Sequence, residues 1–260
     1  MTDVHHDRIR ESFTRQATTF ERADLNAAFT SGLPWLLDLT QPAPADTVLD
    51  VAGGTGLVAR ALAPSVRSAT VVDTTDAMLE AGRDGAASEG LSNVEFVHGD
   101  AEDLPFADRS FSLVVTRFSL HHFEDPAPML DEMVRVTAVP GRIVVKDLVS
   151  SKDPKLAERQ DAVERLRDDS HVRMPTEGAV AGWLEQRGAE VVTAELRTFD
   201  RPLEPWLAQS VTPPDLAEQV RSLLRTELDG GEPTGMRPHL QDGELWFRQT
   251  WETTVARLRA

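Results

Sequence analysis

The sequence predicts an α/β fold, in which a mostly parallel sheet carries helices on both faces. The first observation is that residues 48–62 have the pattern of a buried strand, a glycine-rich turn and a helix. Further strand and helix segments then alternate along the chain, and four such steps in succession imply right-handed crossovers between parallel strands. With 260 residues, 40% of them apolar, the chain can also bury a sizeable core.

Composition narrows the class of partner. A net charge of −16 argues against a nucleic-acid backbone or an anionic membrane as the main partner, because both bind clustered Lys and Arg. A small molecule is favoured instead, and the oligomeric state stays open, with a homodimer as one option. The chain has no cysteine, which excludes disulfides, zinc thiolates and a thiol nucleophile. The charged N-terminus lacks an apolar signal core, and no 18 apolar residues run together, so we expect a cytoplasmic protein.

One domain with appendages is expected over 1–260: terminal helices in 1–40, a ligand-binding core in 41–149 and a C-terminal half in 150–260. Ile9, Phe13, Ala17 and Phe20 recur at spacings of four, four and three, which predicts an amphipathic helix within the first 22 residues. A second helix is expected over roughly Asn26 to Leu39. Both precede the first strand and so lie outside the repeating pattern of the sheet.

The glycine turn indicates a nucleotide-cofactor site. Gly53, Gly54 and Gly56 let a ligand lie against bare backbone, and the following helix points its amides toward the turn. Ordinary strand-to-helix architecture is the alternative, and the run from Gly54 to Ala59 also fits the G-x-G-x-x-A pattern of nicotinamide dinucleotide enzymes. Asp50 argues against a dinucleotide, because a carboxylate at the strand end would repel a diphosphate but attract a sulfonium and an ammonium.

At this turn the sequence resembles the class I S-adenosylmethionine-dependent methyltransferases, whose first motif is acid-x-Gly-x-Gly-x-Gly. Ala52 replaces the first glycine, and the same Ala-Gly-Gly-Thr-Gly run is familiar from the quinone-biosynthesis C-methyltransferases of this class. The resemblance implies S-adenosyl-L-methionine as cofactor. It also implies a Rossmann-like sheet of seven strands in the order 3-2-1-4-5-7-6, with the last strand antiparallel to the others.

The next two strands carry acids at their ends. Ala69 to Asp73 is predicted as the second strand, and Asp73 is placed to accept from both ribose hydroxyls. Val94 to His98 is predicted as the third strand, and the loop after it resembles the adenine-binding segment of the family. The resemblance gives the remaining cofactor-binding positions as Thr74, Met78, Asp100 and the Ala101 amide. Met78 as plain core, and a hydrogen-bonded turn around Asp100, are the structural alternatives.

Two more positions of the family lie in the N-terminal segment. The resemblance implies that residues 13–20 fold over the cofactor as a lid, with Gln16 and Phe20 approaching it. Simple helix packing is the equally weighted alternative.

The fourth strand, Ser110 to Thr116, leads to the candidate catalytic residues. Arg117, His121 and His122 follow its carboxyl end, which is where open α/β sheets place their ligands. Arg117 is expected to line the cofactor or to bind a substrate carboxylate or carbonyl. A base helps if the acceptor is a hydroxyl or an acidic carbon, so either histidine could deprotonate it, or both could be merely structural. The quinone enzymes have Arg-Asn at the matching pair.

The C-terminal half departs from the simple repeat. Asp125 and Pro126 fit the start of a helix, and Ile143 to Asp147 is predicted as the fifth strand. Polar helices are then expected from Asp153 to about Asp168 and from Pro175 to Gly188. The sixth and seventh strands are expected over Glu190 to Phe199 and Glu244 to Val255. Between them, residues 202–242 form an unusually long insertion with a helix over Leu216 to Leu228, which either covers the substrate or packs inertly.

The predicted activity is methyl transfer to a small, apolar biosynthetic metabolite at oxygen or carbon. A short-chain dehydrogenase is nearly excluded, because its Tyr-x-x-x-Lys base needs a tyrosine and the chain has none. The missing cysteines also argue against arsenite methyltransferases. Asp125 and Asp147 are the acids that could suggest a metal-dependent catechol methyltransferase, but no compact ligand set surrounds them, so no metal is expected. The remaining alternative is a protein of this fold that binds the cofactor without transferring its methyl group.

Overall fold

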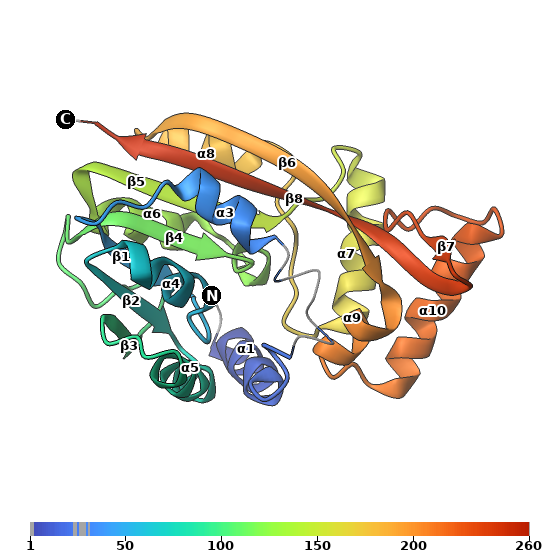
Figure 1. The fold of residues 1–260 in the computed structure, drawn as a ribbon. Helices are drawn as coiled ribbons and strands as arrows, with labels where there is room; N and C mark the ends of the chain where they lie inside the picture. The colour runs from blue at the N-terminus through green and yellow to red at the C-terminus, as the bar shows by residue number, and fades with distance from the viewer. Residues whose placement is uncertain (1–2, 23–24, 26–29, 31, 260) are drawn as a thin grey trace.

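The first strand of the chain occupies the middle of a mixed eight-stranded sheet in the computed structural model, which describes residues 3–22, 25, 30 and 32–259. The strands of the sheet follow the order β3-β2-β1-β4-β5-β8-β6, and β7 adds to β8. The pairs among the first five are parallel, whereas β8 runs antiparallel to both of its long neighbours (Figure 1). The predicted seven-strand order is confirmed, with β8 as the expected last strand and β7 as an additional one.

The strands, in chain order, are β1 (Thr47–Val51), β2 (Ser68–Asp73), β3 (Val94–His98), β4 (Phe111–Arg117), β5 (Thr137–Leu148), β6 (Glu190–Pro202), β7 (His239–Gln241) and β8 (Glu244–Leu258). The α-helices are α1 (Asp3–Gln16), α3 (Leu33–Thr40), α4 (Leu57–Leu62), α5 (Asp76–Ser88), α6 (Ala127–Val136), α7 (Pro154–Arg167), α8 (Ala179–Gln186), α9 (Leu203–Gln209) and α10 (Pro214–Leu228). Two short 3-10 helices are η1 (Ala63–Ser65) and η2 (Leu120–His122). None of the described helices is long and apolar enough to cross a membrane.

Both faces of the sheet are covered because successive strand residues point in opposite directions. Leu49 and Val51 of β1 belong to the apolar cluster that α6 and α8 cover, whereas Val48 belongs to the cluster under α3, α4 and α5. On α6 the buried residues are Met129, Leu130, Met133 and Val136, which form one stripe at helical spacing. The predicted two-sided architecture is therefore present.

Several element boundaries differ from the prediction by a few residues. β5 begins at Thr137 rather than Ile143, because its pairing with β4 continues through a register shift between Phe111 and Leu113. α6 begins after Pro126, and the Asp125 side chain accepts a hydrogen bond from the Ala127 amide at 2.9 Å.

Two helices near the ends of the chain's central region also differ from the prediction. α8 starts at Ala179 rather than at 175–177, since Gly178 adopts a left-handed conformation with φ of 82°. The helix expected from Asn26 begins outside the described residues, and its described part is α3.

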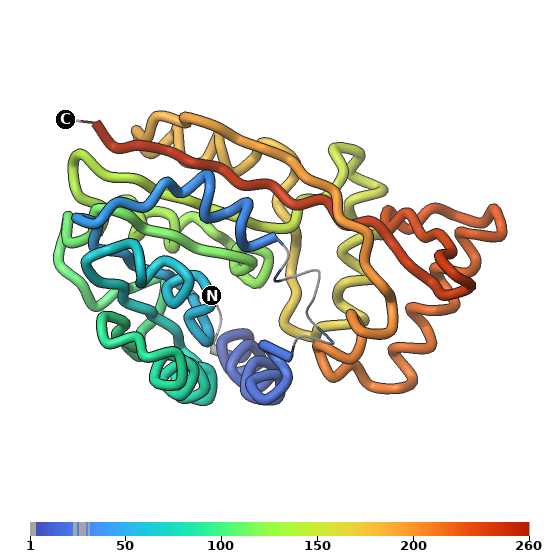
Figure 2. Tube along the Cα trace, viewed as in Figure 1, coloured from blue at the N-terminus to red at the C-terminus, as the bar shows by residue number. Residues whose placement is uncertain are grey.

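The insertion between β6 and β8 has its own apolar core. α9 and α10 pack against α7 through buried side chains that include Trp206, Val220, Val163 and Phe247. β6 and β8 pair along most of their length, so both strands run from the central sheet into the insertion, as the chain trace shows (Figure 2). The insertion is therefore joined continuously to the end of the sheet.

Candidate active site

A cavity opens at the carboxyl ends of the parallel strands. It encloses about 1270 Å³ of space that no protein atom fills, including its open side. Most of the residues predicted to bind the cofactor or to catalyse line it: Gln16, Phe20, Asp50, Ala52, Gly53, Gly54, Asp73, Thr74, Asp100, Ala101, Arg117, His121 and His122.

Gly56 and Met78 are the two predicted site residues that do not line this cavity. Gly56 shapes the turn: its φ is 71°, and a Cβ there would come within 2.7 Å of a Val71 methyl carbon. Met78 is fully buried, and its sulfur lies 3.9 Å from the position that a Cβ on Gly54 would take. Met78 thus packs beside the glycine turn as a buried side chain, which agrees with its alternative interpretation as a core residue.

The acid at the end of β1 packs against the glycine turn and is hydrogen-bonded to the helix that follows it. Asp50 is 1% exposed; its Oδ2 accepts from the Ala59 amide at 3.0 Å, and its Oδ1 is buried without a hydrogen-bond partner. A Cβ on Gly53 would lie 2.7 Å from the Asp50 carboxyl carbon, so only glycine fits there. Burial raises the pKa of Asp50 to about 7, although the Ala59 amide and Arg117 favour its ionised form. An orphaned carboxylate oxygen beside the cavity fits a cationic ligand.

Asp73 connects the turn to the start of α5. Its Oδ2 accepts from the Gly54 amide at 2.8 Å, and its Oδ1 accepts from the Thr75 amide at 2.9 Å. Burial raises the pKa of Asp73 despite these two amides. Each carboxylate oxygen has a second lone pair, so Asp73 can still accept from hydroxyl groups in the cavity. Its proposed role toward a ribose and its role at the helix start are therefore compatible.

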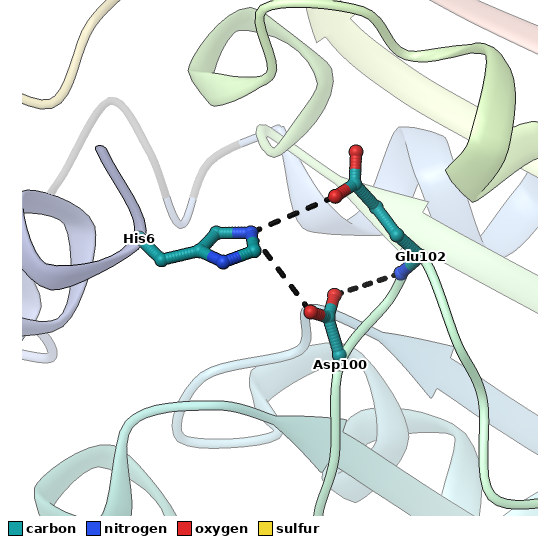
Figure 3. A group of neighbouring side chains, drawn as sticks. All are labelled: His6, Asp100 and Glu102. Atoms are coloured by element: carbon teal, nitrogen blue, oxygen red, sulfur yellow. Dashed lines mark hydrogen bonds and ion pairs between the residues drawn. The ribbon is translucent and has the colours of Figure 1, made fainter. Parts of the chain in front are cut away.

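The loop after β3 meets the N-terminal helix α1 at the cavity. Asp100 closes a local turn by accepting from the Glu102 amide at 2.9 Å, and it also lines the cavity. The His6 ring of α1 faces both acids, with Nε2 at 3.8 Å from Asp100 Oδ2 and 3.6 Å from Glu102 Oε2 (Figure 3). Among the described residues, these three form the group whose potential metal ligands lie within 4.8 Å of one another. The sequence-based expectation of no metal stays a prediction.

Further contacts attach α1 to the rest of the site. Ser12 and Gln16 donate to the two oxygens of Asp168 at 3.2 and 3.3 Å. His5 donates from Nε2 to the His122 carbonyl at 2.7 Å. The Phe13 ring meets the His122 ring edge-on, with centroids 5.1 Å apart. α1 therefore forms one wall of the cavity, and its role as a lid stays a prediction.

The two histidines of η2 differ sharply in their surroundings. His121 Nδ1 lies 2.5 Å from Asp147 Oδ1, and the other Asp147 oxygen accepts from the Leu120 amide at 2.7 Å. Burial alone would lower the pKa of His121, but the Asp147 carboxylate raises it, helped by the charges of Glu164 and Asp168.

Among the described residues, no carboxylate oxygen is hydrogen-bonded to the His122 ring, although the charge of Asp168 acts on it. Its Nδ1 lies 3.1 Å from the Ser170 carbonyl oxygen, to which it can donate. Burial and the neighbouring charge of His121 lower the pKa of His122 well below the usual value of 6.5. The two ring centroids are 4.1 Å apart, so a positive charge on one ring disfavours a charge on the other, and Asp147 favours the charge on His121.

The structure adds residues that sequence reasoning missed. Asp147 was recognised only as a scattered acid, although its position at the end of β5 could have indicated the same sheet edge. Asp168 follows α7, while Arg201 and Gln249 come from the ends of β6 and β8 that approach the insertion. No local motif marks these last three residues, because only the folded chain brings them to the cavity.

Comparison with known proteins agrees with this geometry. Residues 48–141 match the family model described as methyltransferase domain. The uncharacterized methyltransferase YcgJ of Bacillus subtilis is 33% identical over 190 residues, which cover 72% of this chain and 74% of that protein. The demethylmenaquinone methyltransferase of Clavibacter sepedonicus is 32% identical over 176 residues, covering 66% of this chain and 71% of that enzyme.

Solved structures extend the likeness to nearly the whole chain. The crystal structure of YcgJ from Bacillus subtilis has a TM-score of 0.80 at 27% identity, covering 89% of this chain and 99% of that one. The [4+2]-cyclase SpnF shares the fold alone, with a TM-score of 0.64 at 16% identity over 94% of this chain and 96% of that one. Because the matched segment holds the glycine turn and the acids of β1, β2 and β3, this chain belongs to the class I S-adenosylmethionine-dependent methyltransferases.

Proposed function

We propose that the protein transfers a methyl group from S-adenosylmethionine to a hydroxyl or an acidic carbon of a small, largely apolar acceptor, with His121 as general base. The observation that carries this proposal is the His121–Asp147 pair, whose histidine lines the same cavity as the proposed cofactor-binding residues. When bound, S-adenosylmethionine supplies an electrophilic methyl group on a sulfonium. The residues of the chain then have to hold the acceptor in line and remove its proton.

Asp147 prepares His121 for proton removal in two ways. Its hydrogen bond to Nδ1 orients the ring and keeps a proton on that nitrogen, which leaves Nε2 as the basic atom. Its charge also raises the pKa of His121, which makes the neutral ring a stronger base. The low pKa of His122 makes that ring a weaker base, so we assign His122 to the wall of the cavity.

The walls around the histidine pair suit an apolar acceptor. Phe13 and Phe20 from the N-terminal segment, together with Phe123 and Leu148 beyond the strands, line the same cavity. These side chains exclude water from the acceptor and from the methyl group, which favours transfer to the acceptor over loss to solvent.

The insertion of residues 202–242 is proposed to act on the acceptor side. All cofactor motifs lie upstream of it, and Gln209 is its residue that lines the cavity among those described. The remainder of the insertion packs on α7 through the Trp206 cluster. We therefore expect it to shape the acceptor end through Gln209 and the adjoining strand ends.

Transfer of a labelled methyl group tests this proposal. The purified protein is incubated with S-adenosylmethionine labelled in its methyl group and with fractionated small-molecule extracts, and label is followed into products. His121→Ala should lower kcat by about 10²- to 10⁴-fold, the usual range for general-base assistance, with little change in cofactor affinity. His98→Ala is the matched control, because His98 is exposed and pairs with Asp76 away from the cavity.

Two results would contradict the proposed function. Full activity in His121→Ala would leave proximity as the source of catalysis. Tight S-adenosylmethionine binding without any labelled product would favour the alternative of a cofactor-binding protein that does not transfer methyl groups.

A further inference from the structure

A buried guanidinium lines the cavity on the side of the C-terminal half. Arg201, near the end of β6, is 4% exposed. Its Nη1 donates to Gln249 Oε1 at 3.0 Å, and its Nη2 donates to Gln209 Oε1 at 3.2 Å. Both glutamines line the cavity with it, and so does Arg167 at the end of α7. β6, β8, α7 and α9 thus bring two cations to one wall.

Arg201 has only neutral partners among the described residues. No carboxylate oxygen of the described chain lies within 4.0 Å of its nitrogens, and its Nε is buried without a partner. Glu164 is near, but it accepts from Gln249 Nε2 at 2.8 Å and lies 3.7 Å from Arg167 Nη1. Burial and repulsion from Arg167 and Arg117 lower the pKa of Arg201 to about 9. Buried charges are normally paired, so an unpaired one beside a cavity indicates a counter-ion that arrives with a ligand.

The other acid near this wall is already engaged. Asp168 accepts from Ser12, Gln16, and the Ser170 amide and hydroxyl. These bonds occupy both of its carboxylate oxygens and attach it to α1 and to its own loop. Asp168 therefore holds α1 through Ser12 and Gln16, and it forms no ion pair with Arg201.

The charged residues that line the cavity are unevenly distributed: two arginines come from the C-terminal half together with Asp168, and three acids lie at the glycine turn and the strand ends with Arg117 beside Asp50. Asp50, Asp73 and Asp100 lie at the glycine turn and the neighbouring strand ends, where the proposed donor is cationic. Arg201 and Arg167 come from the C-terminal half, whose α9 and α7 lie on the opposite side of α1 from α4 and α5 (Figure 1). The histidine pair follows β4, between the two groups of elements. An anionic group on the acceptor would place a negative charge beside Arg201 and Arg167.

We propose that Arg201, flanked by Arg167, binds a carboxylate or phosphate group of the methyl acceptor. A guanidinium has five N–H groups, and the two hydrogen bonds to Gln249 and Gln209 leave three of them for an anion. Its planar fork matches a carboxylate or phosphate with two parallel bonds. This inference rests on the proposed function of the cavity, and it makes the acceptor a small organic acid or phosphate ester with an apolar body.

Binding of model anions tests the proposal directly. The protein is saturated with S-adenosylhomocysteine, and benzoate and phenyl phosphate are titrated by calorimetry, with neutral benzamide as the isosteric comparison. At least one anion should bind the wild type, and Arg201→Gln should weaken it about 10- to 100-fold, as expected for lost hydrogen bonds to a charged group. Arg201→Lys should retain part of the affinity. Arg248→Gln removes one exposed arginine of β8 that pairs with Asp200, and should change nothing.

A second variant leaves Arg201 in place. Gln209→Glu would set a carboxylate against Arg201 within the chain. It should raise the melting temperature and block binding of the model anions, whereas a purely structural Arg201 predicts no effect on anions. Failure of both anions to bind the wild type, or equal binding by Arg201→Gln or Gln209→Glu, would overturn the proposal.

The donor also carries a carboxylate, and a separate measurement distinguishes that source. Affinities for S-adenosylhomocysteine and for methylthioadenosine, which lacks the amino-acid group, are compared in the wild type and in Arg201→Gln. Unchanged values support an acceptor site. Selective loss of S-adenosylhomocysteine affinity would assign Arg201 to the donor and overturn the inference. No binding of S-adenosylhomocysteine to the wild type would instead refute the proposed function, whatever the anions do.

Discussion

Asp147 is the residue that makes the two histidines different, and it sets the pH range that we expect if His121 is the base. Its carboxylate holds His121 Nδ1 at 2.5 Å and raises the pKa of that ring. A base must be neutral to accept a proton, so wild-type kcat should rise with pH through a pKa above the ordinary value of 6.5. Asp147→Asn removes the negative charge that raises the pKa. The midpoint of the rise should therefore move to lower pH, and the plateau kcat should fall because the ring is less well oriented.

The pH profile of kcat at saturating donor measures both effects. The matched control is Asp161→Asn, because Asp161 forms a second buried histidine pair, with His171 at 2.8 Å, but does not line the cavity. The control should keep the wild-type midpoint. A profile that is identical in the wild type and in Asp147→Asn would show that His121 is not the titrating base.

Asp73 is the sharpest test of the cofactor assignment. Replacement by Ala removes the proposed acceptor of two ribose hydroxyls and also releases the Gly54 amide of the turn. Affinity for S-adenosylhomocysteine should fall by about 1.5 to 3 kcal/mol, because the lost hydrogen bonds involve a charged group. Calorimetry measures it, and Asp76→Ala, an exposed acid three residues further on, is the control. Unchanged affinity in Asp73→Ala would place the ribose elsewhere.

The residues that could be predicted are those whose role follows from local sequence. Asp50 precedes its glycine turn directly, and Asp73 ends the next strand, so fold topology alone brings them to one edge. Arg201 and Asp168 could not be predicted in this way. Their partners, such as Gln249 for Arg201 and Ser12 for Asp168, lie 48 and 156 residues away in the chain. Polar contacts of this kind depend on tertiary packing, which leaves no periodic signal in the sequence.

At the scale of elements, α1 contacts the rest of the cavity through the Phe13 ring and through a few polar pairs. Ser12 and Gln16 both donate to Asp168, whereas the His6 pairs with Asp100 and Glu102 are longer. An element that is held by only a few contacts can open and close, and a lid must do this to admit its ligands. We expect α1 to govern how fast the cofactor leaves.

The double variant Ser12→Ala and Gln16→Ala should therefore release bound S-adenosylhomocysteine about tenfold faster or more, because two hydrogen bonds to a charged group are lost. Stopped-flow displacement measures the rate. Arg15→Ala on the same helix is the control, since Arg15 forms an exposed pair with Asp169 at 3.0 Å. A release rate equal to that of the wild type would favour simple helix packing over a lid.

Helices and strands could be predicted where a hydrophobic pattern was clear, and they were missed where the segment was too short to show one. The strand β3 was predicted with its observed ends, and α10 was placed within two residues. The strand β7 has only three residues, too few for a pattern, and it exists because the turn at 242–243 folds it onto β8. Likewise Lys146, buried against the rings of Trp35 and Trp251, joins α3 to β5 in a way that no local pattern indicates.

At the scale of the whole molecule, β8 makes the insertion and the cofactor half one structure. At one end Trp246 pairs with Pro202 beside α9, and at the other Leu258 pairs with Gly141 of the central sheet. Trp251 and Phe247, both fully buried on this strand, belong to two different apolar clusters. Unfolding either end of β8 exposes apolar surface at the other, so the chain should unfold in a single transition.

A ligand that binds only the folded cofactor half should then stabilise the entire chain. At about 100 times its Kd, S-adenosylhomocysteine adds about 2.7 kcal/mol to the free energy of unfolding. For a protein of this size that raises the melting temperature by about 5 to 10 °C. NAD at the same concentration should give no shift, because the Asp50 carboxylate at the end of β1 repels a diphosphate.

Differential scanning calorimetry measures this shift, with Asp73→Ala at the same ligand concentration as the control that should respond less. Hydrogen exchange of α10 provides a second measurement: this helix lies in the insertion, and among the described residues it contributes none to the cavity lining. Its slowest amides should gain the same protection as those of β1, since both exchange through global unfolding. Two separate transitions, with only one moved by the ligand, would show instead that the insertion unfolds independently of the cofactor half.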